Sequence, residues 1–194
     1  MKVIFLDIDG VLNTEKRAEE LWTSVQEGKM SKEEYYETWD LPFDDTALPL
    51  KKIVDFTGAV LVLSSSWRNI PKSVEKLSKS LKKYDMELFG TTCKGVSLET
   101  VAELGFDPNN CHAIYNFRDC QEGEFTFDRG AEIAYWLKQH PDVDSFVILD
   151  DDIADIEPYY KKEHIRTSFT GDGLTYELAD KAIEILNNEE NIDN

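Results

Sequence analysis

The stretch Lys2–Gly10, KVIFLDIDG, is an almost continuous β-prone apolar run that ends in two aspartates and a glycine. Such a run is typical of a parallel strand that is covered on both faces. The pattern recurs in Ala59–Leu63 (AVLVL), which is followed by three serines, and in Ser145–Leu149 (SFVIL), which is followed by three aspartates. The sequence therefore predicts three buried parallel strands, each ending in a cluster of polar side chains.

Helical patterns lie between these strands. Four segments have apolar residues at helical spacing. They are 48–57, which carries Leu48, Ile53 and Phe56 and closes at Gly58; 71–81, which begins at Pro71; 129–137, which follows the candidate N-cap Asp128; and 175–185. Weaker strand patterns cover residues 86–91 and 164–168. Strands that alternate with helices predict an α/β fold with a doubly wound parallel sheet and right-handed crossovers.

Two segments do not follow this alternation. Residues 13–40 are highly charged and contain two short helical patterns broken at Gly28, whereas residues 90–127 mix aromatic and turn residues with one short helical pattern. We interpret both as insertions in one core. Residues 1–12 and 41–194 then form the core, with an irregular insertion at about 90–127, and residues 13–40 form a small helical cap.

Composition limits the function. The chain has 194 residues, with 21 basic and 39 acidic side chains and a net charge of −18. So acidic a surface repels nucleic acid, which argues against extended nucleic-acid binding but leaves room for a small phosphorylated ligand or a chain end. No apolar run is long enough for a membrane span, and the N-terminus does not resemble a signal peptide. We therefore expect a cytoplasmic protein with no membrane association.

The cysteines indicate neither a disulfide framework nor a zinc site. Cys93, Cys111 and Cys120 are an odd number and form no C-x-x-C motif. A reducing cytoplasm fits this pattern best, and we expect the three thiols to be inert.

The polar strand ends predict a metal site. In an open parallel sheet, ligands bind at the carboxyl ends of the strands, so Asp7, Asp9, Ser64 and the acidic run 150–152 are expected to lie close together. Crowded carboxylates repel one another unless a cation lies among them, and an oxygen-only set suits Mg²⁺. Mg²⁺ usually shares its ligands with substrate phosphate, which predicts a phosphate ester as the substrate. The expected metal-binding residues are Asp7, Asp9, Asp150 and Asp151.

The residue types at these strand ends also predict catalytic roles. Asp7 can attack phosphorus as a nucleophile, and Asp9 can protonate the leaving oxygen and later activate water.

Four further residues are candidates for holding the phosphoryl oxygens. Gly10 permits a sharp turn that exposes backbone N–H groups. Ser64 or Ser65 can donate a hydroxyl, the choice between them depending on strand register, and Arg129 offers positive charge at a helix start. For the serines, ordinary N-capping of the next helix is an alternative role, and for Arg129 a surface ion pair is equally consistent with the sequence.

The motifs resemble those of the haloacid dehalogenase-like (HAD) superfamily. FLDIDGVL resembles motif I, VLS motif II and ILDD the acidic motif IV of that superfamily, in residues 5–12, 62–64 and 148–151. The stretches LSSSWR, RGAEIAYWL and FVILDDD, which begin at Leu63, Arg129 and Phe146, are similar to the HAD domains of Swiss Army Knife RNA repair proteins. The resemblance implies a Rossmann-like core and a Mg²⁺-dependent phosphohydrolase that forms an aspartyl-phosphate intermediate.

The sequence departs from the superfamily pattern at two motifs. The usual motif III lysine is replaced by Arg129, with Lys94 and Lys138 as rival candidates. Motif IV can be read as the pair Asp150–Asp151 or with Asp155 as a further or alternative ligand. Trp67 is expected in the core, and Arg68 is expected either in a salt bridge or at a second phosphate.

These observations predict a Mg²⁺-dependent phosphatase. The resemblance suggests a nucleotide or a nucleic-acid end as its substrate, whereas the net charge favours a small phosphometabolite; the oligomeric state stays open. The alternative is a non-catalytic phosphate- or partner-binding module on the same scaffold, although mere binding would not require Asp9. A response-regulator receiver is disfavoured, because there the acid pair precedes the phosphorylated aspartate.

Overall fold

A parallel sheet forms the centre of the protein. The computed structural model describes residues 1–112, 114–116 and 124–188. The sheet has five strands in the order β3-β2-β1-β7-β8, and every neighbouring pair is parallel. Its strands are β1 (Lys2–Leu6), β2 (Val60–Leu63), β3 (Leu88–Thr91), β7 (Ser145–Asp150) and β8 (His164–Arg166). This sheet confirms the predicted α/β class.

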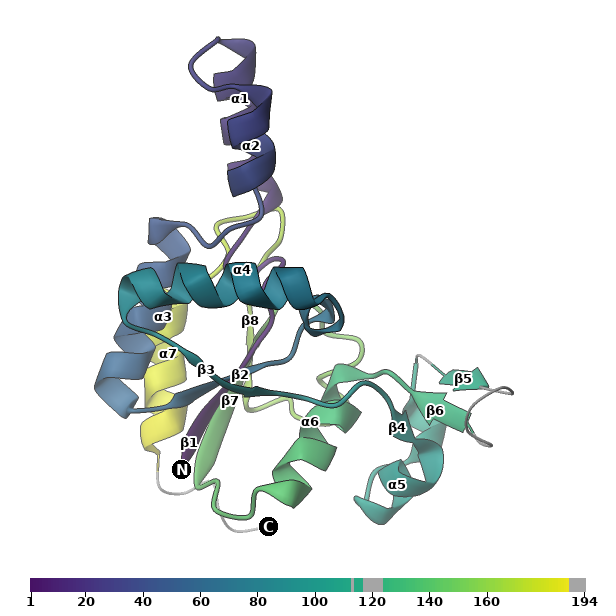
Figure 1. Ribbon diagram of the computed structural model, residues 1–194. Helices are drawn as coiled ribbons and strands as arrows, with labels where there is room; N and C mark the ends of the chain where they lie inside the picture. The colour runs from purple at the N-terminus through teal and green to yellow at the C-terminus, as the bar shows by residue number, and fades with distance from the viewer. Residues whose placement is uncertain (113, 117–123, 189–194) are drawn as a thin grey trace.

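Helices cover both faces of the sheet, with α3 and α7 side by side on one face and α6 on the other (Figure 1). The helices and 3-10 turns of the core are α3 (Asp44–Thr57), η1 (Ser66–Asn69), α4 (Pro71–Leu81), η2 (Lys82–Tyr84), α6 (Arg129–Gln139) and α7 (Tyr176–Asn187). Side-chain alternation along β1 explains the two layers. Ile4 and Leu6 pack with residues of α3, α4 and α7, whereas Val3 and Phe5 pack with residues of α6.

The expected helix at residues 48–57 is present, but its exposed and buried faces differ from the predicted stripe. Leu48 and Phe56 are 44% and 70% exposed. Ile53, the third member of the predicted stripe, is buried as expected, and Ala47 and Leu50, which are not part of that stripe, are buried with it. The face of α3 that packs against the sheet and α7 is the one that becomes buried. The sequence alone does not distinguish an apolar residue on that face from one on the exposed face. The helix ends at Gly58, which adopts a left-handed conformation, as predicted.

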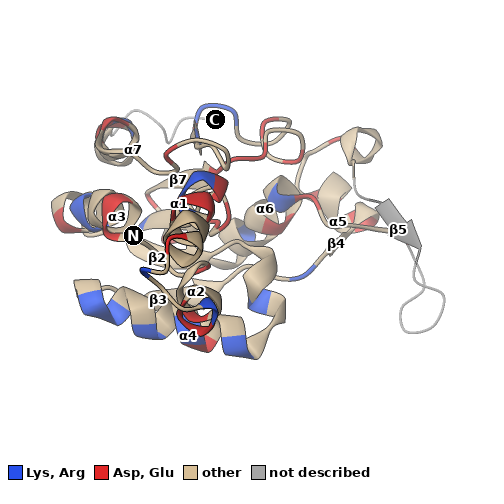
Figure 2. Ribbon diagram, turned by 90° about the horizontal axis from the view of Figure 1, so that it is seen from above, with Lys and Arg blue, Asp and Glu red and all other residues tan. Residues whose placement is uncertain are grey.

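The segment predicted as a cap forms a helical hairpin of α1 (Glu15–Gln26) and α2 (Lys32–Thr38). The hairpin projects beyond the edge of the sheet at which β1 ends, and seen from above it stands over the middle of the molecule (Figures 1 and 2). Thr14 caps α1, and Ser31 forms a capping box with Glu34 at the start of α2. Neither helix buries a residue completely. The hairpin therefore has no core of its own.

The insertion predicted to be irregular contains a small antiparallel sheet in the order β4-β6-β5. Its elements are β4 (Val96–Ser97), α5 (Leu98–Glu103), η3 (Pro108–Asn110), β5 (Ile114–Asn116) and β6 (Glu124–Thr126). Strands of two or three residues are too short to show a period in the sequence. Val96, Val101 and Cys111 pack with Ala131 of α6, so this unit is attached to the core through that helix.

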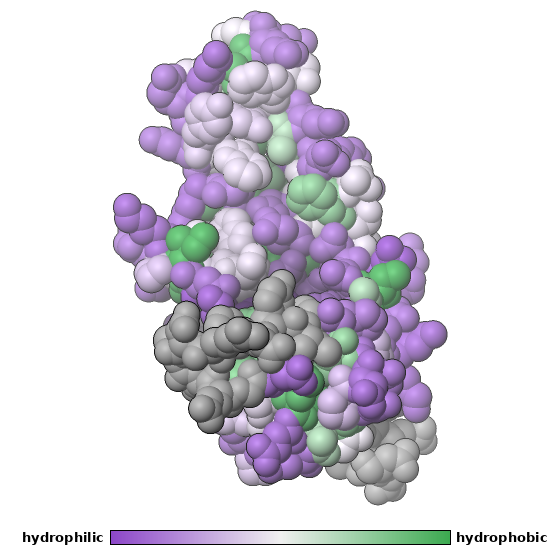
Figure 3. Space-filling view, turned by 90° about the vertical axis from the view of Figure 1, so that its right-hand side faces the viewer, coloured by the Kyte–Doolittle hydropathy of each residue, from purple (hydrophilic) through white to green (hydrophobic). Residues whose placement is uncertain are grey.

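One side of the molecule shows how apolar and hydrophilic residues are distributed on its surface. Figure 3 shows the side that carries β5 and β6, where apolar residues are scattered among hydrophilic ones. Lysines form a row on α4 (Figure 2). Within the described ranges, no helix is long and apolar enough to cross a membrane. Cys93 and Cys111 are free thiols, and Cys120 lies outside the described residues.

Candidate active site

The carboxyl ends of the three central strands lie level with one another. Leu6 of β1 is in register with Leu63 of β2 and with Leu149 of β7. The ladder continues one residue further, because the Ser64 N–H donates to the Leu6 carbonyl at 2.8 Å and the Asp7 N–H donates to the Leu149 carbonyl at 2.9 Å. The strand order places β2 and β3 on one side of β1, and β7 and β8 on the other. The strand order therefore reverses at β1, and the carboxyl ends of β1, β2 and β7 form the switch point of the sheet, where such folds bind ligands.

Three carboxylates meet at this point. Asp7, Asp150 and Asp151 each offer an oxygen, and these atoms all lie within 4.8 Å of one another. We call these residues the carboxylate cluster. Asp7 and Asp150 are only 8% and 4% exposed. Among the residues that the structure describes, no lysine or arginine forms an ion pair with any of the three.

Burial and mutual repulsion raise the pKa values of the carboxylate cluster. Burial raises the pKa of Asp7 to about 6, although a hydrogen bond with Ser65 and the charge of Arg129 act in the opposite direction. Burial and the negative charge of Asp7 raise the pKa of Asp150 well above its ordinary value. Burial also raises the pKa of Asp151. A hard divalent cation is the partner that would relieve this repulsion, and the all-oxygen donor set fits Mg²⁺.

Asp151 approaches the turn after β1 so closely that only glycine fits there. Gly10 has a φ of +80°, and a Cβ at this position would lie 2.5 Å from Cγ of Asp151. The Gly10 N–H donates to the Asn13 carbonyl at 2.8 Å, within the turn itself. Gly10 thus permits the close approach of motif I and motif IV.

Asp9 is held outside the carboxylate cluster by a tryptophan. The Trp67 indole Nε1 donates to Asp9 Oδ2 at 3.0 Å. Trp67 is only 9% exposed and belongs to the main core, as expected, but its hydrogen bond with Asp9 is a second role that the sequence did not reveal. The bond occupies one carboxylate oxygen of Asp9.

The two candidate serines differ in their hydrogen bonds. The Ser65 hydroxyl interacts with Asp7 and also accepts from the Trp67 N–H at 3.4 Å. The Ser64 hydroxyl is buried and has no hydrogen-bond partner among the described residues. A buried polar group normally has a partner, so Ser64 is the serine whose hydroxyl is available to a bound oxygen.

Arg129 lies at the start of α6 and takes part in a buried ionic network. Glu132 is fully buried, and its Oε2 lies 2.5 Å from Nη2 of Arg68 and 3.4 Å from Nη1 of Arg129. Its other oxygen accepts from the Gly95 N–H at 2.8 Å, and Arg68 Nη1 donates to the Ser65 carbonyl at 2.9 Å. We call Arg68, Glu132 and Arg129 the Glu132 network. It connects α6 to the loop after β2 and to the segment before β4.

Sequence reasoning missed Glu132, because a glutamate within a helix is usually solvated. Its position three residues after Arg129, where the two side chains share a helix face, is the signal that could have indicated the pair. Arg68 forms the salt bridge that was one of its two expected roles. The charge of Arg129 lowers the pKa values of Asp7 and Asp150, so Arg129 acts electrostatically on the carboxylate cluster as well.

At the start of α6, Asp155 accepts the backbone hydrogen bond that was expected to go to the candidate N-cap Asp128. Asp128 is at the N-cap position but makes no side-chain cap; its carboxylate accepts from the His112 N–H and the Tyr159 hydroxyl. The Arg129 N–H donates instead to Asp155 Oδ2 at 3.3 Å. Asp155 is not a member of the carboxylate cluster.

The rival candidates for motif III lie elsewhere. Lys138, in the last turn of α6, pairs with Glu103 at 3.4 Å. Lys94 is exposed and lies in the segment before β4. Of the three basic residues considered for motif III, Arg129 is the one whose charge acts on both Asp7 and Asp150.

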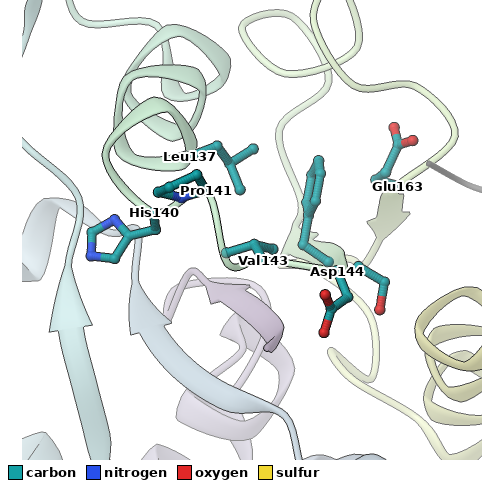
Figure 4. A pocket seen from close by; sticks show the side chains of 8 residues that line it. Leu137, His140, Pro141, Val143, Asp144 and Glu163 are labelled. Atoms are coloured by element: carbon teal, nitrogen blue, oxygen red, sulfur yellow. The ribbon is translucent and has the colours of Figure 1, made fainter. Parts of the chain in front are cut away.

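A separate hollow of about 200 Å³ lies at the amino end of β7, around Leu137, His140 and Phe146 (Figure 4). Its acidic residue Asp144 already accepts a hydrogen bond from the backbone nitrogen of Met1. Because β7 begins at Ser145 and ends at Asp150, this hollow is at the opposite edge of the sheet from the carboxylate cluster. It contributes nothing to the site.

The parallel sheet, with acidic residues after β1 and β7, defines an α/β protein of the HAD type. Residues 3–179 match the family described as the HAD domain in Swiss Army Knife RNA repair proteins, and the chain belongs to this family. Comparisons with curated proteins and with solved structures gave no match. Membership supports a hydrolase or phosphatase type of activity in general, in a family that is generally Mg²⁺-dependent.

Proposed function

We propose that this protein is a Mg²⁺-dependent phosphatase that hydrolyses a phosphate monoester through an aspartyl-phosphate intermediate on Asp7. The observation that carries the proposal is the carboxylate cluster, which lies at the switch point of the sheet and is paired with no lysine or arginine of the described residues. The Ser64 hydroxyl, which has no partner among the described residues, lies at the end of the neighbouring strand β2 and supports the proposal, because it could donate a hydrogen bond to a phosphoryl oxygen.

The donor set suits the metal. Asp7, Asp150 and Asp151 would hold Mg²⁺, with Asp9 contributing its backbone carbonyl. When bound, the ion supplies positive charge that offsets the repulsion between these carboxylates and an incoming phosphate.

The chemistry then belongs to two aspartates. A carboxylate oxygen of Asp7 attacks phosphorus, a new P–O bond forms, and the bond to the leaving oxygen breaks. Asp9 donates a proton to that oxygen and afterwards takes one from the water that attacks phosphorus, which releases inorganic phosphate and restores Asp7. Trp67 fixes the carboxylate of Asp9 during both transfers, since it donates to one of its oxygens.

Ser64 and Arg129 hold the phosphoryl oxygens in this proposal. The Ser64 hydroxyl donates a hydrogen bond, and Arg129 balances negative charge as it develops. The hairpin of α1 and α2 stands over the edge of the sheet where β1 ends, and it would limit the access of water and of large substrates.

The substrate is proposed to be a small phosphorylated molecule, a nucleotide or the phosphorylated end of a nucleic acid. The family name points to nucleic-acid ends, and the net charge of −18 argues against extended contact with a polyanion. We further propose a cytoplasmic location, in which the free thiols Cys93 and Cys111 stay reduced.

Hydrolysis of p-nitrophenyl phosphate tests the proposal. The wild-type protein should release phosphate with Mg²⁺, lose this activity in EDTA, and lose it on substitution Asp7→Asn. Asp152→Asn is the matched control, because Asp152 is an exposed aspartate next to the carboxylate cluster but not part of it. Full turnover by Asp7→Asn would show that Asp7 is not the nucleophile. Mg²⁺ binding without turnover of any phosphate ester would favour a non-catalytic module.

A further inference from the structure

A second hollow borders the carboxylate cluster. It has a volume of about 450 Å³ and is lined by Asp151 and by the segment 166–170, which begins with the last residue of β8. We call it the β8 hollow. Because Asp151 is a member of the carboxylate cluster, a molecule in the β8 hollow would lie directly beside the proposed reaction site.

The segment that forms the hollow is fixed between the sheet and the cap. The Thr167 N–H donates to the Asp150 carbonyl at 3.0 Å, and the N–H of Glu15, the first residue of α1, donates to the Phe169 carbonyl at 2.9 Å. The loop after β8 accordingly rises to the base of the cap (Figure 1). A substrate held under the cap would therefore pass close to this loop.

The charge of Arg166 distinguishes the β8 hollow. Arg17, Arg68 and Arg129 each pair with a glutamate. Arg166 forms no ion pair and donates no side-chain hydrogen bond within the described part of the chain. An unpaired guanidinium beside an acidic site is suited to a phosphate, which it can bind through two parallel hydrogen bonds.

The neighbouring side chains add an independent indication of a ligand. Thr167 is only 5% exposed, and its hydroxyl has no hydrogen-bond partner in the part of the chain that the structure describes, although buried hydroxyls normally have one. Phe169 is 40% exposed and presents an aromatic ring at the rim. Positive charge, an unsatisfied hydroxyl and an aromatic ring thus line one hollow.

We propose that the β8 hollow is a subsite for the leaving group, and that Arg166 binds a second phosphate carried by the substrate. The proposal rests on the proposed phosphatase function and adds the requirement for two phosphates. The first phosphate reacts at Asp7. The second phosphate binds Arg166 in the β8 hollow, which Asp151 separates from Asp7. The Phe169 ring is available to the organic part of the leaving group.

Substrates with one and two phosphates test this subsite. We would measure phosphate release from p-nitrophenyl phosphate, adenosine 5′-phosphate, adenosine 3′-phosphate and adenosine 3′,5′-bisphosphate. The wild-type protein should have its highest kcat/KM with the bisphosphate. Arg166→Gln should lower the ratio of kcat/KM for the bisphosphate to that for p-nitrophenyl phosphate by about 10- to 100-fold, mainly through KM, because one charge-assisted contact is lost.

Two further variants make the result specific. Arg166→Lys keeps the charge and should recover part of the ratio. Lys162→Gln removes a positive charge from an exposed position four residues earlier, outside the hollow, and should leave the ratio unchanged. An unchanged ratio in Arg166→Gln, or an equal decrease in Lys162→Gln, would overturn the subsite.

Failure of the phosphatase proposal is distinguishable from failure of the subsite. If the wild-type protein hydrolyses none of these esters, the binding of adenosine 3′,5′-bisphosphate to the wild type and to Arg166→Gln, measured by calorimetry, tests whether Arg166 binds a phosphate in the β8 hollow. Weaker binding by Arg166→Gln supports the subsite without the reaction, and equal binding or no binding overturns it.

Discussion

The two buried charge clusters of this protein are balanced in opposite ways. The carboxylate cluster contains three acidic groups and no ion pair with a described lysine or arginine. Burial raises the pKa values of its members, as it also raises the pKa of Glu132. In the Glu132 network one buried glutamate is shared by two arginines and a backbone N–H. Both clusters lie beside the loop that follows β2, since Ser65 interacts with Asp7 through its hydroxyl and with Arg68 through its carbonyl.

The difference separates a structural arrangement of charge from a functional one. A buried charge that is satisfied within the chain holds elements together, and it destabilises the fold when one partner is removed. A buried cluster of like charges costs stability and implies a partner from outside the chain. Neutralising a member of each cluster should therefore have opposite effects on stability.

The largest expected effect is on activity. Asp7→Asn should lower kcat for p-nitrophenyl phosphate by roughly 10³-fold or more, because the nucleophile is lost. The same substitution removes a charge from the carboxylate cluster, so the unfolding temperature in EDTA should not fall. Activity and thermal unfolding measured on one preparation separate the two effects. A loss of activity that is accompanied by unfolding would make Asp7 a structural residue.

Removal of Glu132 should have the largest effect on stability. Glu132→Ala leaves Arg68, whose side chain is 6% exposed, buried without its partner, and should lower the unfolding free energy by about 3–5 kcal/mol. Glu75→Ala breaks the solvent-exposed pair with Lys79 and should leave the unfolding free energy nearly unchanged. Urea denaturation measures both values. Equal effects of the two substitutions would show that the Glu132 network does not stabilise the fold.

A smaller effect concerns the stability of the metal-free protein as a function of pH. The pKa of Asp7 is raised from 3.8 to about 6 in the folded state, so the folded protein binds more protons than the unfolded chain between these values. The unfolding free energy in EDTA should therefore fall as the pH rises from about 4 to 6, with a contribution from Asp7 of up to about 3 kcal/mol. Asp7→Asn should make this dependence shallower. An equal pH dependence of the unfolding free energy in the variant and the wild type would contradict the raised pKa of Asp7.

The strand ends could be predicted because burial leaves a clear pattern. A short, continuous apolar run indicates a strand that is covered on both faces of a parallel sheet. The acidic residues that follow β1 and β7 are then expected at the same edge of the sheet, where the carboxyl ends of the strands lie. The cap helices were predicted as well, from two helical patterns broken at Gly28, and the helix over residues 71–81 was predicted from its apolar spacing and from Pro71 at its start.

The supporting contacts could not be predicted in the same way. The bonds of Glu132 with Arg68, of Asp155 with Arg129 and of Trp67 with Asp9 join residues 26 to 64 positions apart in the chain, and no local period indicates these pairs. The sheet of β4, β5 and β6 was missed for a different reason, because its strands are too short to show alternation. Local pattern thus predicts which strand ends meet, whereas tertiary contacts determine which serine hydroxyl lacks a described partner, which aspartates cluster and which arginine lies near them.

Calorimetric titration with Mg²⁺ is the most direct test of the shared metal site. The wild-type protein should bind one Mg²⁺ ion, Asp150→Asn should weaken binding by at least about tenfold, and Asp152→Asn should bind like the wild type. Asp152 is exposed and only two residues from Asp150, so the control removes the same charge from the same loop. Absence of binding to the wild type, or undiminished binding to Asp150→Asn, would contradict the claim that β1 and β7 together hold a divalent cation.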